Sequence, residues 1–126
     1  MRPMRPMRPM QLTTEQIAQI AHDANMGYSL SRLDFSQGPW SETPDWVRES
    51  AIAMVEYVRK NPNAKPEEVH SSWSKNKMKD GWTLGPRTDP FHKTHSCLVQ
   101  YENLPESQKA KYYIFLAVVR SCLNIT

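Results

Sequence analysis

Two polar side chains, His22 and Asn25, stand three residues apart beside a run of small and branched apolar residues. Residues three or four apart share one face of a helix, so Ala18, His22 and Asn25 predict a polar line that borders an apolar stripe. Hydrogen-bonding groups in that position are typical of the wall of a half-buried pocket, and Tyr28 continues the same helix. A helix flank in water, with the imidazole and the amide bonded to neighbouring loops, explains the pattern equally well.

Large aromatic residues follow at loop and helix-end positions, where a ring can stack on the base of a nucleotide. Stacking of this kind contributes about 1–3 kcal/mol per base. Trp40 and Tyr101 lie in segments without a helical period, and we expect Trp40 to face a ligand. Trp73 and Trp82 are expected to form a small core that holds the loop between them and the next helix, and Trp82 is also a candidate for base stacking.

A basic stretch at residues 75–93 carries five cations against two acidic residues. Within it, Lys77 and Arg87 stand near two glycine turns, and this combination indicates contact with a phosphate or a carboxylate. Glycine allows close backbone approach, and the cations supply charge-assisted hydrogen bonds. Asp89 is expected to orient backbone amides or to pair with these cations. Neither a Walker loop nor a GxGxxG motif is present, and a solvated lysine-rich loop is an equally good explanation.

His92, His95 and Cys97 resemble a set of metal ligands at first sight, but their spacing is too tight for a usual zinc site and no second ligand pair follows. We therefore predict no bound metal. No nucleophile–base pair, carboxylate pair or cofactor loop is evident in the sequence. The prediction is a protein without catalytic residues or cofactor. A hydrolase that uses His22 or His95 is the weaker alternative.

The net charge of +3 comes entirely from residues 1–10, which hold three arginines and no acid. The remaining residues carry thirteen basic and thirteen acidic groups, so they lack the broad positive face of a duplex-binding protein. No apolar run approaches the ~20 residues of a membrane span, no export signal is recognisable, and two cysteines do not indicate a disulfide framework. We predict a cytoplasmic protein that has no specific duplex nucleic acid and no membrane among its partners.

The elements that must position these residues have readable start signals. Thr13 and Gln16 form a predicted capping box for a first helix. Thr43 is the predicted N-cap of a second helix, with Pro44 as its first residue. A third helix is expected to begin at Pro66, and a fourth near residues 104–106.

Residues 81–103 lack a helical period and predict a long ordered loop. Within it, residues 82–84 and 97–99 are compatible with a minimal antiparallel β pair. The predicted fold is mainly α: a single small domain of about four helices at residues 12–126. A tail of Met-Arg-Pro repeats at residues 1–11 is expected to be disordered and dispensable to the fold, because it cannot bury enough apolar area.

The order of residues from His70 to Gly85, continued by Asp89, His95, Tyr101, Leu104–Pro105 and Lys109, resembles the RyR domain first described in ryanodine receptors. The similarity extends upstream over Ile17–Asn25, Tyr28 and Trp40, so it covers roughly residues 15–123. RyR domains also occur as small free-standing bacterial and viral proteins. In receptors they are implicated in adenine-nucleotide binding, and bacterial relatives stand beside ion-channel-like and defence-associated domains. The resemblance therefore implies a sensor of nucleotide-derived signals.

Together, the residues and the resemblance predict a non-catalytic domain that binds a small nucleotide-derived molecule, for sensing or for sequestration such as a virus would use against host defence. The predicted ligand-binding residues are His22, Asn25, Tyr28, Trp40, Lys77, Trp82, Arg87, Asp89, His95 and Tyr101. The alternative is a protein–protein interaction or homo-oligomerisation module without a small ligand. A large exposed apolar patch would favour that alternative.

Overall fold

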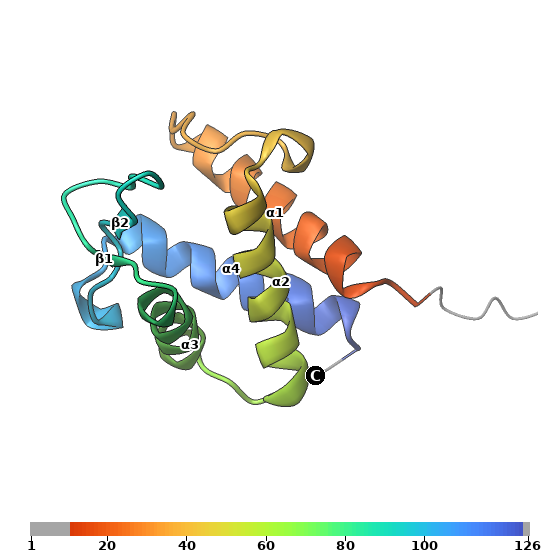
Figure 1. The fold of residues 1–126 in the computed structure, drawn as a ribbon. Helices are drawn as coiled ribbons and strands as arrows, with labels where there is room; N and C mark the ends of the chain where they lie inside the picture. The colour runs from red at the N-terminus through yellow and green to blue at the C-terminus, as the bar shows by residue number, and fades with distance from the viewer. Residues whose placement is uncertain (1–10, 125–126) are drawn as a thin grey trace, which may run out of the picture.

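The structure is a computed structural model, and it describes residues 11–124. Four helices dominate it, which confirms the mainly α prediction (Figure 1). The elements in chain order are α1 (Thr14–Ser31), η1 (Trp40–Glu42), α2 (Asp45–Lys60), α3 (Pro66–Lys79), β1 (Thr83–Leu84), β2 (Thr94–His95), η2 (Tyr101–Asn103) and α4 (Glu106–Cys122). The predicted tail lies outside the described residues, except for its last residue. No described helix is both long enough and apolar enough to cross a bilayer.

The helix starts follow the local signals closely. The backbone N–H of Gln16 donates to the Thr13 hydroxyl at 3.1 Å, and the Gln16 side chain accepts from the Thr13 N–H at 2.8 Å, so the capping box is confirmed. Helix α3 begins at Pro66, as predicted. Helix α2 begins one residue late, with Pro44 as its N-cap, because the Thr43 hydroxyl donates to the Pro39 carbonyl instead of capping the helix.

The core lies where α1 crosses α4 and α2. Its fully buried members include Ile17, Val55, Val58, Val69 and Val119, each at most 1% exposed. Burial of one such side chain contributes about 1.5–3 kcal/mol relative to exposure. On α4, Phe115 and Val119 are buried, while Tyr112, Cys122 and the following Leu123 are partly buried and pack against the core.

The prediction of an antiparallel β pair was wrong in direction and in its second strand. Strand β1 pairs with β2 in parallel, with Thr83 opposite Thr94 and Leu84 opposite His95. The chain between them folds back through an antiparallel bridge from Asp89 to Thr94, which reverses its direction before β2 begins. Gly85 permits the close approach, because a Cβ at that position would lie 2.6 Å from the Cβ of Thr94.

The segment predicted as the second strand, residues 97–99, has another role. The Val99 carbonyl accepts a hydrogen bond from Nε2 of His70 at 2.7 Å. The His70 side chain on α3 therefore occupies the Val99 carbonyl, which in a strand would accept a hydrogen bond from the neighbouring strand. This contact ties the long loop to α3 and explains why no ladder forms at this point.

Candidate functional site

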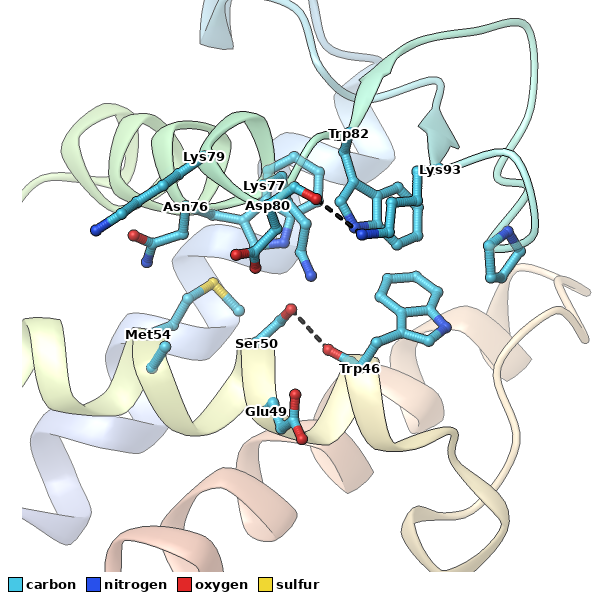
Figure 2. A pocket seen from close by; sticks show the side chains of 13 residues that line it. Trp46, Glu49, Ser50, Met54, Asn76, Lys77, Lys79, Asp80, Trp82 and Lys93 are labelled. Carbon is cyan, nitrogen blue, oxygen red and sulfur yellow. Dashed lines mark hydrogen bonds between the residues drawn. The ribbon is translucent and has the colours of Figure 1, made fainter.

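A cavity of about 570 Å³ separates the N-terminal half of α2 from the C-terminal end of α3. Figure 2 shows the side chains of the two helices facing each other across it, with Trp82 and Lys93 covering the side near the loop. Its volume lies within the range typical of small-molecule sites. The lining residues are Trp46, Glu49, Ser50, Ala53, Met54, Trp73, Asn76, Lys77, Lys79, Asp80, Trp82, Pro90 and Lys93.

The end of α3 places Trp82 at this cavity. Gly81 has φ 91°, a conformation that is natural only to glycine, and it allows the chain to turn back over the last turn of the helix. The Trp82 N–H then donates to the Lys77 carbonyl at 2.9 Å, and the Gly81 N–H donates to the Met78 carbonyl at 3.0 Å. These two bonds hold the Trp82 ring beside the side chain of Lys77.

Lys77 is 5% exposed, and its ammonium lies beside a pair of indole rings that contact each other. The nitrogen is 4.9 Å from the ring centroid of Trp46 and 5.2 Å from that of Trp82, which is cation–π distance. Among residues 11–124, no carboxylate lies within 4.0 Å of it. Burial lowers the pKa of Lys77, against the opposing influence of Asp80 and Glu49. A cation held in this way is available to an anionic ligand group.

Two smaller cavities of about 190 Å³ each adjoin the large one and share Met54 and Trp73 with it. Two of the residues that line them each carry a buried polar atom without a hydrogen-bond partner among residues 11–124: Oδ1 of Asn25 and Nε1 of Trp46. The amide of Asn25 is oriented by its Nδ2, which donates to the Lys111 carbonyl at 3.2 Å. One acceptor and one donor next to the inner space are therefore unsatisfied, which costs about 1–3 kcal/mol each.

His95 lies at the same inner space, between Trp73 and Trp46. The Cys97 N–H donates to Nδ1 of His95 at 3.0 Å, so in the neutral ring the proton is on Nε2. Burial, followed by the charge of Lys77, lowers the pKa of His95 to about 4. At neutral pH the ring is therefore an uncharged hydrogen-bond donor at the cavity.

This lowered pKa predicts a loss of stability in mild acid. Because the folded-state pKa of His95 lies below the unfolded value of about 6.5, the unfolded chain takes up the proton first, and stability falls as the pH drops from about 6.5 through 4. The free energy of unfolding should fall by about 1–2 kcal/mol more in the parent than in His95→Asn, allowing for partial solvent access. Urea unfolding at pH 7 and at pH 4 measures this difference. Equal losses in both proteins would contradict it.

Trp73 packs against His70, which is hydrogen-bonded to Tyr112. The ring of His70 stacks on Trp73 with centroids 5.7 Å apart. The Tyr112 hydroxyl donates to Nδ1 of His70 at 2.8 Å, while Nε2 donates to the Val99 carbonyl. Burial raises the pKa of Tyr112 far above its ordinary value, so the hydroxyl keeps its proton. The imidazole is thus fixed in one tautomer and one orientation.

A comparison with models of known protein families identifies the family of this chain. Residues 43–123, more than half of its length, match the model of the RyR domain. The chain belongs to the RyR domain family. The matched residues include every residue that lines the large cavity, whereas α1 precedes the match.

Five of the predicted site residues meet around these adjoining cavities of the RyR domain. Lys77 and Trp82 line the large cavity, and His22, Asn25 and His95 line an inner one. The large cavity lies between α2 and α3, and the inner ones also include residues of α1. The part of these side chains in ligand binding stays a prediction.

The other five predicted residues lie away from these cavities. Trp40, which was expected to face a ligand, is 6% exposed and packs in the core with its ring 5.5 Å from His22. Tyr28 lies under the guanidinium of Arg32, and Arg87 is exposed. Asp89 accepts from the N–H groups of Phe91 and His92, which agrees with its predicted orienting role. Tyr101 lines a separate groove of about 590 Å³ on another side of α3.

The sequence interpretation overlooked Trp46, which lines both the large cavity and an inner one of the RyR domain. Its ring lies 4.7 Å from that of Trp82. A signal was present: Trp46, Ser50 and Met54 recur every four residues and so share one face of α2. Among residues 11–124, no group of three or more His, Cys, Asp or Glu side chains is arranged to hold a metal ion.

Proposed function

We propose that this RyR domain binds a small, anionic, nucleotide-derived molecule without transforming it. The observation that carries the proposal is the Lys77 ammonium, which lies beside Trp46 and Trp82 at a cavity of about 570 Å³. Among residues 11–124 it has no carboxylate within 4.0 Å. An unpaired buried cation is costly in a stable fold, because it loses solvation without gaining a counter-ion. A ligand phosphate at Lys77 would supply that counter-ion.

The rest of the ligand has matching partners around the same space. Trp46 is only half-buried, so its ring offers a face for a base, whereas Trp82 is 5% exposed and supports it from behind. The two rings already touch, so the base stacks on the pair and does not enter between its members. A group of the ligand that reaches the inner space meets the side chains of Asn25 and Trp46, which each carry an unsatisfied polar atom.

Lys79 and Lys93 add positive charge at the rim, against Glu49 and Asp80. The Lys93 ammonium is already engaged, since it donates to the Asp80 carbonyl at 2.9 Å. A site with this small excess of positive charge suits one or two phosphates better than a polymer of them. Binding without turnover is the chemistry of a sensor or of a protein that sequesters a signal.

Calorimetry tests the proposal directly. The full chain would be titrated with mononucleotides, cyclic dinucleotides and ADP-ribose derivatives. At least one of these should bind with one-to-one stoichiometry, and mass spectrometry after prolonged incubation should recover it unchanged. If none of them binds, the proposal fails. If the ligand is hydrolysed, the non-catalytic part of the proposal fails and the hydrolase alternative replaces it.

Replacing Asn25 by alanine should weaken binding by about 1–3 kcal/mol, because a buried polar partner of the ligand is lost. Fold stability should change less, since the only hydrogen bond lost within the described residues is the one to the Lys111 carbonyl. Asn63→Ala is the matched control, because Asn63 is exposed in the connection between α2 and α3. An Asn25→Ala protein that binds like the parent would remove the inner cavity from the site.

A further inference from the structure

Helix α1 ends in a turn in which a leucine takes the left-handed backbone conformation that usually belongs to glycine or asparagine. The Leu33 N–H donates to the Leu30 carbonyl, and the Asp34 N–H donates to the Ser29 carbonyl, both at about 3.0 Å. This pair of bonds is the Schellman motif, in which the residue after the C-cap takes the left-handed conformation. Leu33 occupies that position with φ 59°. A leucine is unfavourable there, because its Cβ crowds the following carbonyl.

Helices α3 and α4 end in the same conformation with residues that suit it. Gly81 occupies the same position after α3 with φ 91°, and Asn124 occupies it after α4 with φ 57°. Glycine and asparagine are the residues that tolerate this conformation best. Among the three helix ends of this kind, the leucine after α1 is therefore the exception, and its exposed side chain gains nothing locally from the strain.

The strained turn holds apolar side chains out into solvent. Leu33 is 79% exposed, Phe35 is 72% exposed and Leu30 is 44% exposed. We call these three residues the α1 apolar turn, which lies at the upper edge of the molecule in Figure 1. None of them lines the cavities described above. A local rule broken without internal compensation indicates a contact outside the folded chain.

Charges on either side of Leu33 indicate which partner fits. Arg32 precedes it and Asp34 follows it, and neither forms an ion pair within 4.0 Å among residues 11–124. The Asp34 carboxylate accepts from the Ser36 N–H at 2.9 Å, which fixes its position. Hydrogen bonds from the side chain and the N–H of Ser36 lower the pKa of Asp34. A cation and an anion that flank one apolar residue in the chain are complementary to a second copy related by a two-fold axis.

We propose that the α1 apolar turn is the contact of a symmetric homodimer. Leu33 packs against Leu33 of the second copy, and Arg32 of each chain pairs with Asp34 of the other. Leu30 and Phe35 widen the apolar contact on either side. Three side chains make a small interface, so the dimer is weak and forms only at high protein concentration. The large cavity is left open in both copies, which makes the dimer independent of the proposed ligand.

Sedimentation equilibrium across a range of concentrations tests the dimer, with Leu33→Gly as the main variant. Glycine removes the side chain and fits φ 59° without strain, so the turn should be kept and the melting temperature should stay equal or rise. The dimer dissociation constant should rise by about a hundredfold or more, because each of the two copies loses a buried leucine. A parent protein that is monomeric at every concentration would overturn the proposal. A Leu33→Gly protein that associates like the parent would also overturn it.

Phe91→Ser is the matched control for a general loss of surface hydrophobicity. Phe91 is 89% exposed and lies outside the α1 apolar turn, so this variant should dimerise like the parent. If Phe91→Ser weakens association as much as Leu33→Gly does, the contact lies elsewhere. A membrane surface is the competing partner for exposed leucine and phenylalanine. Binding to vesicles of phosphatidylcholine and phosphatidylglycerol that Leu33→Gly abolishes, in a protein that stays monomeric, would replace the dimer with that partner.

A charge exchange tests the symmetry itself. Arg32→Asp and Asp34→Arg should each dimerise less than the parent, because like charges then face each other across the two-fold axis. An equimolar mixture of the two should form a heterodimer, since both cross-pairs become attractive. The melting temperature of Asp34→Arg is measured as well, to show that the variant is folded, because this change also removes the acceptor of the Ser36 N–H. A folded mixture without heterodimer would refute the pairing.

Discussion

Replacing Trp73 by alanine should destabilise the RyR domain by about 3–5 kcal/mol, a large share of the stability of a small domain. The ring is 9% exposed and stacks on His70, and its centroid lies 4.8 Å from that of His95. It also forms a common wall of the large cavity and both inner ones. Truncation would merge these spaces and leave His70 without the surface against which it packs. Equilibrium unfolding in urea, followed by circular dichroism, measures the effect.

Trp73→Phe is the control for this prediction, because it keeps an aromatic surface against His70 and should cost clearly less than alanine. The intact hydrogen bonds of His70 to Tyr112 and Val99 should hold the imidazole in place in the phenylalanine variant. An alanine variant with the unfolding midpoint of the parent would show that the loop is held by other contacts. The assignment of Trp73 as a scaffold residue would then be wrong.

Replacing Lys77 by methionine should separate function from stability. Ligand affinity should fall by about 1.5–3 kcal/mol, the usual contribution of a hydrogen bond to a charged group. The free energy of unfolding should stay equal or increase, because methionine fills a similar volume without a desolvated charge. The lowered pKa of Lys77 determines how the stability of the parent changes with pH. Because the folded state disfavours the ammonium more than the unfolded chain does, the parent gains stability as the pH rises toward the ordinary lysine value of 10.5. Any advantage of the methionine variant should therefore be largest near neutral pH and should narrow in alkali.

Lys79→Met provides a control of equal charge change. Lys79 lines the same cavity but is exposed, so its loss should affect affinity much less. Calorimetry with the ligand identified by the nucleotide panel measures both variants. Should the two lysines contribute equally to affinity, binding would depend on the general charge of the rim. The position of the ammonium beside Trp46 and Trp82 would then have no special part in binding.

The helices of this protein could be predicted because their signals act within a few residues. The Thr13–Gln16 capping box and the proline that opens α3 are contacts inside one helical turn, so the rest of the fold does not change them. The parallel β pair could not be predicted in the same way. Its direction depends on how the chain turns back at the bridge from Asp89 to Thr94. The contact between His70 and Val99, which replaces the predicted second strand, joins segments that are distant in the chain, so only the folded chain decides it.

The candidate site also combines features that the sequence predicts with features that only the fold determines. Its ingredients are visible in the sequence, since Lys77, Trp82, Asn25 and His95 are residue types that suit a nucleotide-like ligand. By itself, the sequence determined a mainly α RyR domain and a reasonable set of polar and aromatic candidates. Only the tertiary structure decided that Trp46 faces Lys77, whereas Trp40 is buried in the core. The physical reason is that burial, and with it the state of each polar group, depends on neighbours brought from other helices.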